Sequence, residues 1–224
     1  MHQEEDPVRV LVVEDYDALG KALTFALGFE EGIEVVGLAP TVSRALEMVA
    51  ASHPDVVLMD VRLPDGNGIE ATSRVMAMRP ETAVIVLTAQ ADSTYALRAA
   101  EAGAAGFTSK DVRIAKVVGC VRQVAAGEPA INETLLRAVL MQASAEASDR
   151  SRGIDPPPEL PAPERDVLEL MAEGLGWQGI AAGLGISVAE AARLTAAVVS
   201  GLGARSHLEA VVLAARTGLV KPTP

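Results

Sequence analysis

The first 127 residues alternate short apolar runs with longer segments in which apolar residues recur at helical spacing. The runs are rich in Val and Ile and almost continuously apolar, which is typical of strands covered on both faces of a parallel sheet. The predicted strands are 8–13, 33–38, 55–60, 83–88 and 105–109. The predicted helices are 17–29, 42–52, 69–78, 93–102 and 112–126. Strands and helices in strict alternation indicate a doubly wound α/β domain with a parallel sheet.

Beyond residue 127 the pattern is helical. An apolar stripe predicts a helix over residues 133–145, which serves either as a connecting helix or as a dimer contact. Residues 148–163 combine charge with five prolines, so they are predicted to form a semi-rigid linker. From residue 164 short helical segments alternate with glycines, as in small helix-turn-helix domains. The predicted organisation is an α/β domain at 1–127, a connecting helix and linker at 128–163, and an all-α domain at 164–224.

Composition and charge narrow the class of protein. The net charge of −11 argues against a chain that coats nucleic acid by bulk electrostatics. Residues 159–224 carry seven acids and five bases, a net −2, which leaves −9 for the residues before them. The single cysteine, Cys120, excludes an intrachain disulfide and is predicted to lie in the core. No apolar stretch approaches the roughly 20 residues that span a bilayer, and the polar first residues do not resemble a secretory signal, so we expect a cytoplasmic protein.

Polar residues gather where the predicted strands end. Glu14 and Asp15 follow the first strand, Asp60 ends the third, Thr88 ends the fourth, and Lys110 follows the fifth. In open α/β sheets the functional crevice lies beyond these carboxyl ends, so the five side chains should converge. Three carboxylates in one crevice need a cation, and oxygen ligands favour a hard ion such as Mg²⁺. A metal beside an exposed aspartate is the arrangement for in-line phosphoryl transfer.

Four segments of this half resemble the signature segments of receiver domains of two-component response regulators: VLVVEDYD, VVLMDVRLPDGNG, VIVLTA and GFTSKD. The resemblance implies a flavodoxin-like (βα)5 fold, Asp60 as the phosphoryl acceptor, and a histidine kinase as partner. For Mg²⁺ it implies Asp15 and Asp60 as direct ligands, Glu14 as a ligand through water, and the backbone carbonyl of Arg62 as a further ligand.

The same resemblance assigns roles around the pocket. Thr88 and Lys110 are implied as phosphoryl contacts, and Phe107 stands at the aromatic switch position that turns inward when Thr88 moves. Arg62 and Gln90 occupy the rim positions that tune how long the phosphoryl group survives. We expect phosphorylation to repack the fourth and fifth helical faces and to favour a homodimer.

Residues 160–220 resemble a LuxR-type helix-turn-helix output domain without a gap. The matching positions are mostly core and turn residues. In that family the turn after the first helix commonly carries a lysine or a similar polar residue, whereas this chain has Trp177 there. The recognition helix, predicted over residues 188–200, carries one base, Arg193, and one acid, Glu190.

The shortage of DNA-contacting side chains on the recognition helix leaves two functions open. Lys and Arg neutralise phosphates, and Arg, Lys, Asn and Gln read base edges, so the predicted DNA contacts are confined to Arg193, Thr195 and Ser200. The architecture predicts a phosphorylation-controlled transcription regulator that is not an enzyme. The alternative is a signalling adaptor whose helical domain binds protein or dimerises. An enzyme finds no support, because the helical part has only His207, no cysteine and no clustered acids.

Overall fold

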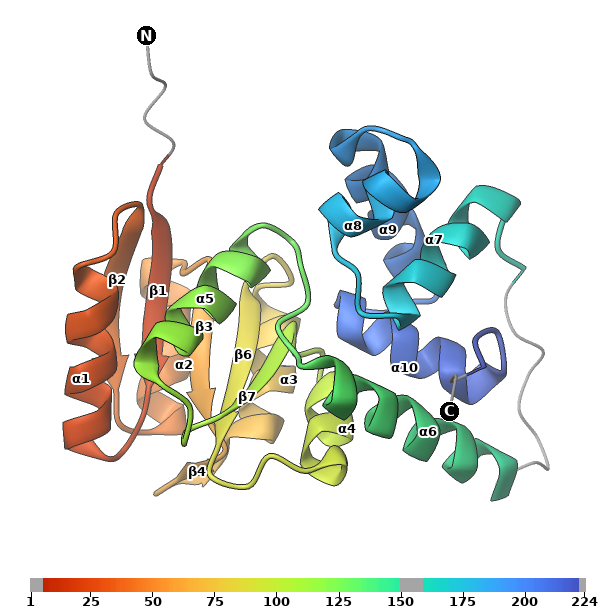
Figure 1. The fold of residues 1–224 in the computed structure, drawn as a ribbon. Helices are drawn as coiled ribbons and strands as arrows, with labels where there is room; N and C mark the ends of the chain where they lie inside the picture. The colour runs from red at the N-terminus through yellow and green to blue at the C-terminus, as the bar shows by residue number, and fades with distance from the viewer. Residues whose placement is uncertain (1–5, 150–158, 222–224) are drawn as a thin grey trace, which may run out of the picture.

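A computed structural model describes residues 6–149 and 159–221 (Figure 1). Its centre is a five-stranded sheet with the order β2-β1-β3-β6-β7, in which every pair is parallel. The strands are β1 (Val8–Val13), β2 (Ile33–Ala39), β3 (Val56–Asp60), β6 (Ala83–Thr88) and β7 (Gly106–Ser109). Strand order reverses beside β1, so the carboxyl ends of β1 and β3 border the crevice. The predicted α/β fold is confirmed.

Helices cover both faces of the sheet. One face packs against α1 (Asp17–Gly28) and α5 (Ile114–Ala125), where Cys120 is buried as predicted. The other face packs against α2 (Val42–Ser52) and α3 (Gly68–Met78), with α4 (Ser93–Glu101) beside α3. Each of these helices ends within two residues of its predicted bounds.

A two-stranded hairpin after β3 was not predicted. It pairs β4 (Arg62–Leu63) with β5 (Gly66–Asn67), strands too short to show an apolar period. The hairpin is followed directly by Gly68, the first residue of α3, whose backbone N–H donates to the Val61 carbonyl at 2.9 Å. A Cβ at Gly68 would lie 1.8 Å from the Asp60 carbonyl oxygen, so only glycine allows this close approach. The hairpin therefore returns the chain tightly over the end of β3.

The carboxy-terminal part is helical, as predicted. Its helices are α6 (Glu133–Asp149), α7 (Ala162–Ala172), α8 (Trp177–Leu184), α9 (Val188–Gly201) and α10 (His207–Thr217). Gly185, with φ +66°, ends α8 in the left-handed region, and the Ser187 side chain accepts the Glu190 N–H to begin α9. The helices α8 and α9 meet at 108°. The predicted linker lies partly outside the described residues, and α7 begins inside its predicted range.

The helix α6 joins the two halves. It packs against α4 on one side and α10 on the other (Figure 1). One apolar cluster runs from Phe107 and α4 through α6 into the centre of the helical domain. In the structure α6 thus acts as a connecting helix, and the two predicted domains share a core.

Polar contacts fasten the helical domain to the carboxyl end of α4. The Arg216 guanidinium pairs with the Glu101 carboxylate, and Arg205 donates to the Glu101 carbonyl. The Ser206 hydroxyl donates to the Ala104 carbonyl at 2.9 Å. These contacts and the shared core hold the helical domain against the α4 face of the sheet domain.

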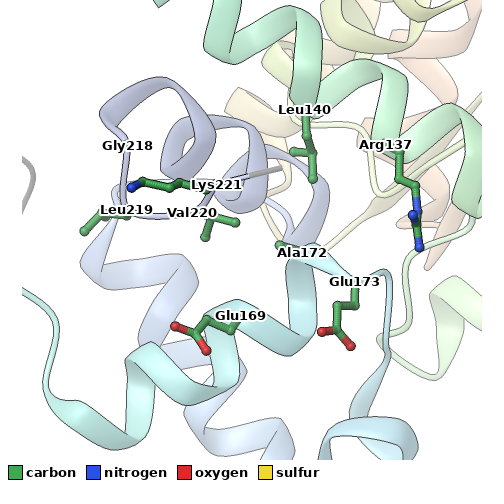
Figure 2. A pocket seen from close by; sticks show the side chains of 9 residues that line it. All are labelled: Arg137, Leu140, Glu169, Ala172, Glu173, Gly218, Leu219, Val220 and Lys221. Carbon is green, nitrogen blue, oxygen red and sulfur yellow. The ribbon is translucent and has the colours of Figure 1, made fainter. Parts of the chain in front are cut away.

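A cavity of about 390 Å³ opens between α6, α7 and the segment after α10 (Figure 2). Its walls carry charges of both signs at Arg137, Glu169, Glu173 and Lys221. The Arg137 guanidinium is already paired with Glu133 at 2.8 Å on its own helix.

Among the described helices, no single one is long and apolar enough to cross a membrane. Only α8 and α9 taken together reach that composition, and these two helices are bent by 108° relative to each other.

Candidate functional site

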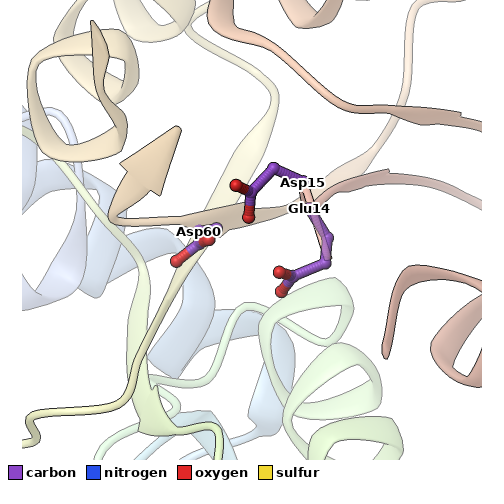
Figure 3. Close-up of side chains that lie close together, drawn as sticks. All are labelled: Glu14, Asp15 and Asp60. Atoms are coloured by element: carbon purple, nitrogen blue, oxygen red, sulfur yellow. The ribbon is translucent and has the colours of Figure 1, made fainter. Parts of the chain in front are cut away.

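Three carboxylates meet at the carboxyl edge of the sheet, as predicted (Figure 3). Glu14, Asp15 and Asp60 each place an oxygen within 4.8 Å of the others. Glu14 and Asp60 are 1% and 3% exposed, whereas Asp15 faces solvent. They converge because β1 and β3 are neighbours and Asp60 is the last residue of β3.

Lys110 reaches this cluster from the end of β7. Its backbone N–H donates to the Thr88 carbonyl at 2.8 Å. Its Nζ lies 2.7 Å from Asp60 Oδ2 and 2.7 Å from Glu14 Oε2. A buried carboxylate is costly unless it is paired, and one ammonium serves two of them here.

The carboxylates outnumber the ammonium that faces them. Burial raises the pKa of Glu14, and the Asp60 charge adds to this effect, while the Lys110 hydrogen bond acts in the opposite direction. A raised pKa means that the negative charge of Glu14 is only partly compensated. The donor set consists of carboxylate oxygens, with one exposed member, and therefore fits a hard divalent cation that keeps several of its waters.

Asp60 borders a hollow of about 20 Å³. Its Oδ1 accepts the Arg62 N–H at 3.2 Å. The Thr88 hydroxyl lies at the same hollow, where it accepts the Gln90 N–H at 3.0 Å and donates to the Gln90 carbonyl at 3.3 Å. The residues that line the hollow are Asp60, Val61, Arg62, Thr88, Ala89, Gln90, Tyr95 and Lys110. The structure thus brings the predicted pocket residues together.

Two aromatic residues connect the pocket with the core. Phe107 is 1% exposed and lies in the apolar cluster of α4 and α6, so it already occupies the inward position. Tyr95, in the first turn of α4, lines the hollow and packs against the same cluster. Sequence reasoning missed Tyr95 because it lies outside the signature segments. Its only signal is an aromatic residue three positions after the N-cap Asp92.

The predicted contacts on α9 differ in their accessibility. Arg193 is exposed, but its guanidinium donates to both carboxylate oxygens of Glu190, at 2.9 and 2.7 Å. Ser200 is exposed. Thr195 is 4% exposed and its hydroxyl is buried, because this face of α9 packs inside the helical domain. The expectation that Thr195 offers a surface contact is therefore corrected.

Comparisons with known proteins agree with this geometry. Residues 10–122 match the family model of the response regulator receiver domain. The chain is 30% identical to the DNA-binding transcriptional activator DevR/DosR of Mycobacterium tuberculosis over 215 residues, which are 96% of this chain and 97% of that protein.

Solved structures show the same likeness. The crystal structure of a two-component response regulator of the LuxR family from Aurantimonas sp. SI85-9A1 is 26% identical, with a TM-score of 0.57 over 61% of this chain and 98% of that one. The RcsB response regulator of Salmonella typhimurium aligns over 92% of this chain and 97% of its own, with a TM-score of 0.57. At 18% identity the second likeness concerns the fold alone.

Proposed function

This chain belongs to the response regulators of two-component systems, and on that premise we propose that Asp60 accepts the phosphoryl group. Its function is phosphorylation-dependent regulation of transcription, as in its transcriptional relatives. The phosphoryl group comes from a partner histidine kinase, and the helical domain carries the output.

The observation that carries this proposal is the Lys110 ammonium at 2.7 Å from the Asp60 carboxylate. The Asp60 oxygen attacks the phosphorus of the kinase phosphohistidine, and the P–N bond breaks as the new O–P bond forms, so that the imidazole is the leaving group. Lys110 then offsets the charge of the transferred group, and the Thr88 hydroxyl donates to one of its oxygens in place of the Gln90 carbonyl. Asp15, Asp60 and the Arg62 carbonyl, with Glu14 through water, would hold a Mg²⁺ ion, which would supply positive charge to offset the charge of the transferring group.

Mg²⁺ is expected to raise the melting temperature of the protein. An ion that binds only the folded state stabilises it, by about 2.7 kcal/mol at a hundredfold excess over Kd. Asp15→Ala removes the exposed carboxylate of the cluster and should abolish this rise and the phosphorylation. Asp17→Ala is the matched control, because Asp17 is an exposed acid on α1 that pairs with Lys21. A Mg²⁺ titration by scanning calorimetry measures both variants, and an undiminished response of Asp15→Ala would contradict the ligand set.

We infer that the output domain binds DNA as a homodimer, through Arg193 and Ser200 on the exposed face of α9. The DNA-binding description of the relative DevR/DosR supports this target. One protomer neutralises few phosphates, because the helical domain has few bases and Glu190 already binds Arg193. Two helical domains on paired half-sites about one helical turn apart would supply the missing affinity.

A second candidate is an adaptor whose helical domain contacts protein. The exposed face of α9 favours it, because Val188 is 47% exposed and Ala189 and Ala196 are also exposed. The only two charged side chains of α9 bond each other. Such a face offers apolar area and few hydrogen bonds.

Selection of random duplex DNA by the full-length protein, with and without a phosphodonor, separates the two candidates. Arg193→Ala is expected to weaken binding to a selected site roughly tenfold, since it removes the only base of α9. Glu190→Ala should strengthen binding, because it frees the Arg193 guanidinium. Arg137→Ala is the control, since Arg137 has a similar ion pair on α6. Failure to select any site would favour the adaptor.

A further inference from the structure

The enclosed part of the hollow beside Asp60 is too small for a phosphoryl group. Its volume of about 20 Å³ is enough for roughly one water molecule. A phosphoryl group brings three oxygens, each about the size of a water, and they must lie near Lys110 and Thr88. A phosphoryl group that contacts both Lys110 and Thr88 inside this hollow therefore displaces part of its wall.

Most residues of the wall can move without disturbing the packing of the core. Arg62, Ala89 and Gln90 are exposed, so they can move into solvent. Val61 is fixed on the sheet, where its N–H donates to the Leu87 carbonyl and its carbonyl accepts the Gly68 N–H. Tyr95 differs from all of these, because it is half-buried against the apolar cluster that α4 shares with α6 and α10.

A displacement of Tyr95 reaches the helical domain through α4. The Asp92 carboxylate accepts the Tyr95 N–H at 3.0 Å, so the residue is fixed to the first turn of the helix. The helix is nine residues long, about 13 Å, so its two ends are close enough for a shift of the first turn to reach the last. Its other end carries Glu101, to which Arg205 and Arg216 bind.

Phe107 cannot provide this movement. It is already buried, and its backbone N–H donates to the Ala130 carbonyl at 2.8 Å. The inward turn expected of a switch aromatic is therefore already made. We propose that Tyr95, rather than Phe107, transmits phosphorylation of Asp60 to the contacts between α4 and the helical domain. This inference rests on the proposed function, in which Asp60 is the acceptor.

The chain contains its own reporter for the test. Trp177 is the only tryptophan, and it packs on Gly127 at the boundary between the two halves. Full-length protein is phosphorylated with acetyl phosphate and Mg²⁺, and the modification is counted by mass. The emission of Trp177 then reports the interdomain equilibrium. We expect phosphorylation to shift this equilibrium at least about fivefold in the wild type and less than about twofold in Tyr95→Ala.

The variants distinguish the effect of the bulk of the Tyr95 ring from the effect of hydrogen bonding by its hydroxyl. The phosphoryl group on Tyr95→Ala is counted by mass, and its emission is compared with that of the wild type at equal modification, so that a loss of response is distinguished from a loss of chemistry. Tyr95→Phe should respond like the wild type, because the ring fills the wall. Should Tyr95→Ala prove too unstable, Tyr95→Leu keeps apolar contact with the core and shortens the side chain. Phe107→Leu should retain the response.

Three results would overturn the inference. The first is a full emission change in phosphorylated Tyr95→Ala. The second is loss of the change in Phe107→Leu while Tyr95→Ala keeps it, which would return the switch to Phe107. The third is a phosphorylated wild type without any change. A wild type that takes no phosphoryl group at all would reject the proposed function and this inference with it, and the mass measurement identifies that case.

Discussion

Asp60→Asn is expected to abolish phosphorylation by a small phosphodonor in the presence of Mg²⁺. Asparagine keeps the shape of the side chain and an oxygen that can accept the Arg62 N–H, which lies 3.2 Å from Asp60 Oδ1. It removes the negative charge that holds Lys110 and the nucleophilic oxygen itself. The wild type should gain the mass of one phosphoryl group, and the variant should gain none.

Two neighbouring aspartates provide the controls. Asp65 accepts the backbone N–H groups of Val42 and Ser43 at 2.7 and 2.9 Å. The hydrogen bond from Ser43 is the main reason why the pKa of Asp65 is lowered. Asp55 accepts the Arg9 N–H at 2.8 Å, at the opposite edge of the sheet from Lys110. Asp55→Asn and Asp65→Asn should both retain the label, and a label that persists in Asp60→Asn would place the acceptor elsewhere.

The sheet and its pocket were predictable because they depend on local patterns. Apolar runs such as 56–59 are buried on both faces, and parallel strands bring residues at their carboxyl ends to one edge. This rule alone brought Glu14, Asp60 and Lys110 together. The hairpin after β3 was not predicted, because a strand of two residues is too short to show an alternation of apolar and polar positions. Its geometry also depends on the close approach of Gly68 to Asp60.

What escaped prediction depends on contacts between distant residues. Thr195 was expected at the surface as a polar residue of a recognition helix, but it lies four positions after Ala191 on the buried face, next to Leu194 and Val198. A single helix with apolar residues on several sides does not reveal which side faces its own domain. The shared core around α6 is likewise decided by α4 and α10, which are more than a hundred residues apart in the chain.

Trp177 is the clearest example of such a contact. It lies fifty positions from Gly127, and a Cβ added at Gly127 would meet its ring at 1.9 to 2.6 Å. The LuxR-type domains that this part resembles commonly carry a lysine or similar polar residue in this turn. Here the position holds an aromatic side chain that binds the receiver half, and its indole N–H is buried without a partner among the described residues.

Gly127→Ala is therefore expected to release α8 from the receiver half. The new methyl group overlaps the Trp177 ring, and overpacking of this kind costs roughly 1–3 kcal/mol. Gly127 also has φ +73°, where alanine adds strain of its own. Trp177 is the only tryptophan, so the tryptophan fluorescence of the protein reports the environment of this ring. Its emission should shift to longer wavelength, and acrylamide should quench it more strongly.

Gly32→Ala separates the two effects of this substitution. Gly32 has φ +76°, so alanine is strained there to a similar degree, but a Cβ would meet nothing within 4 Å. Both variants should lose stability, and only Gly127→Ala should change the environment of Trp177. Trp177→Ala should destabilise the interdomain contact in the same way as Gly127→Ala, and combining the two should add little, because one contact is lost in each. Equal emission spectra for the two glycine variants would mean that the Trp177 ring does not rest on Gly127 in solution.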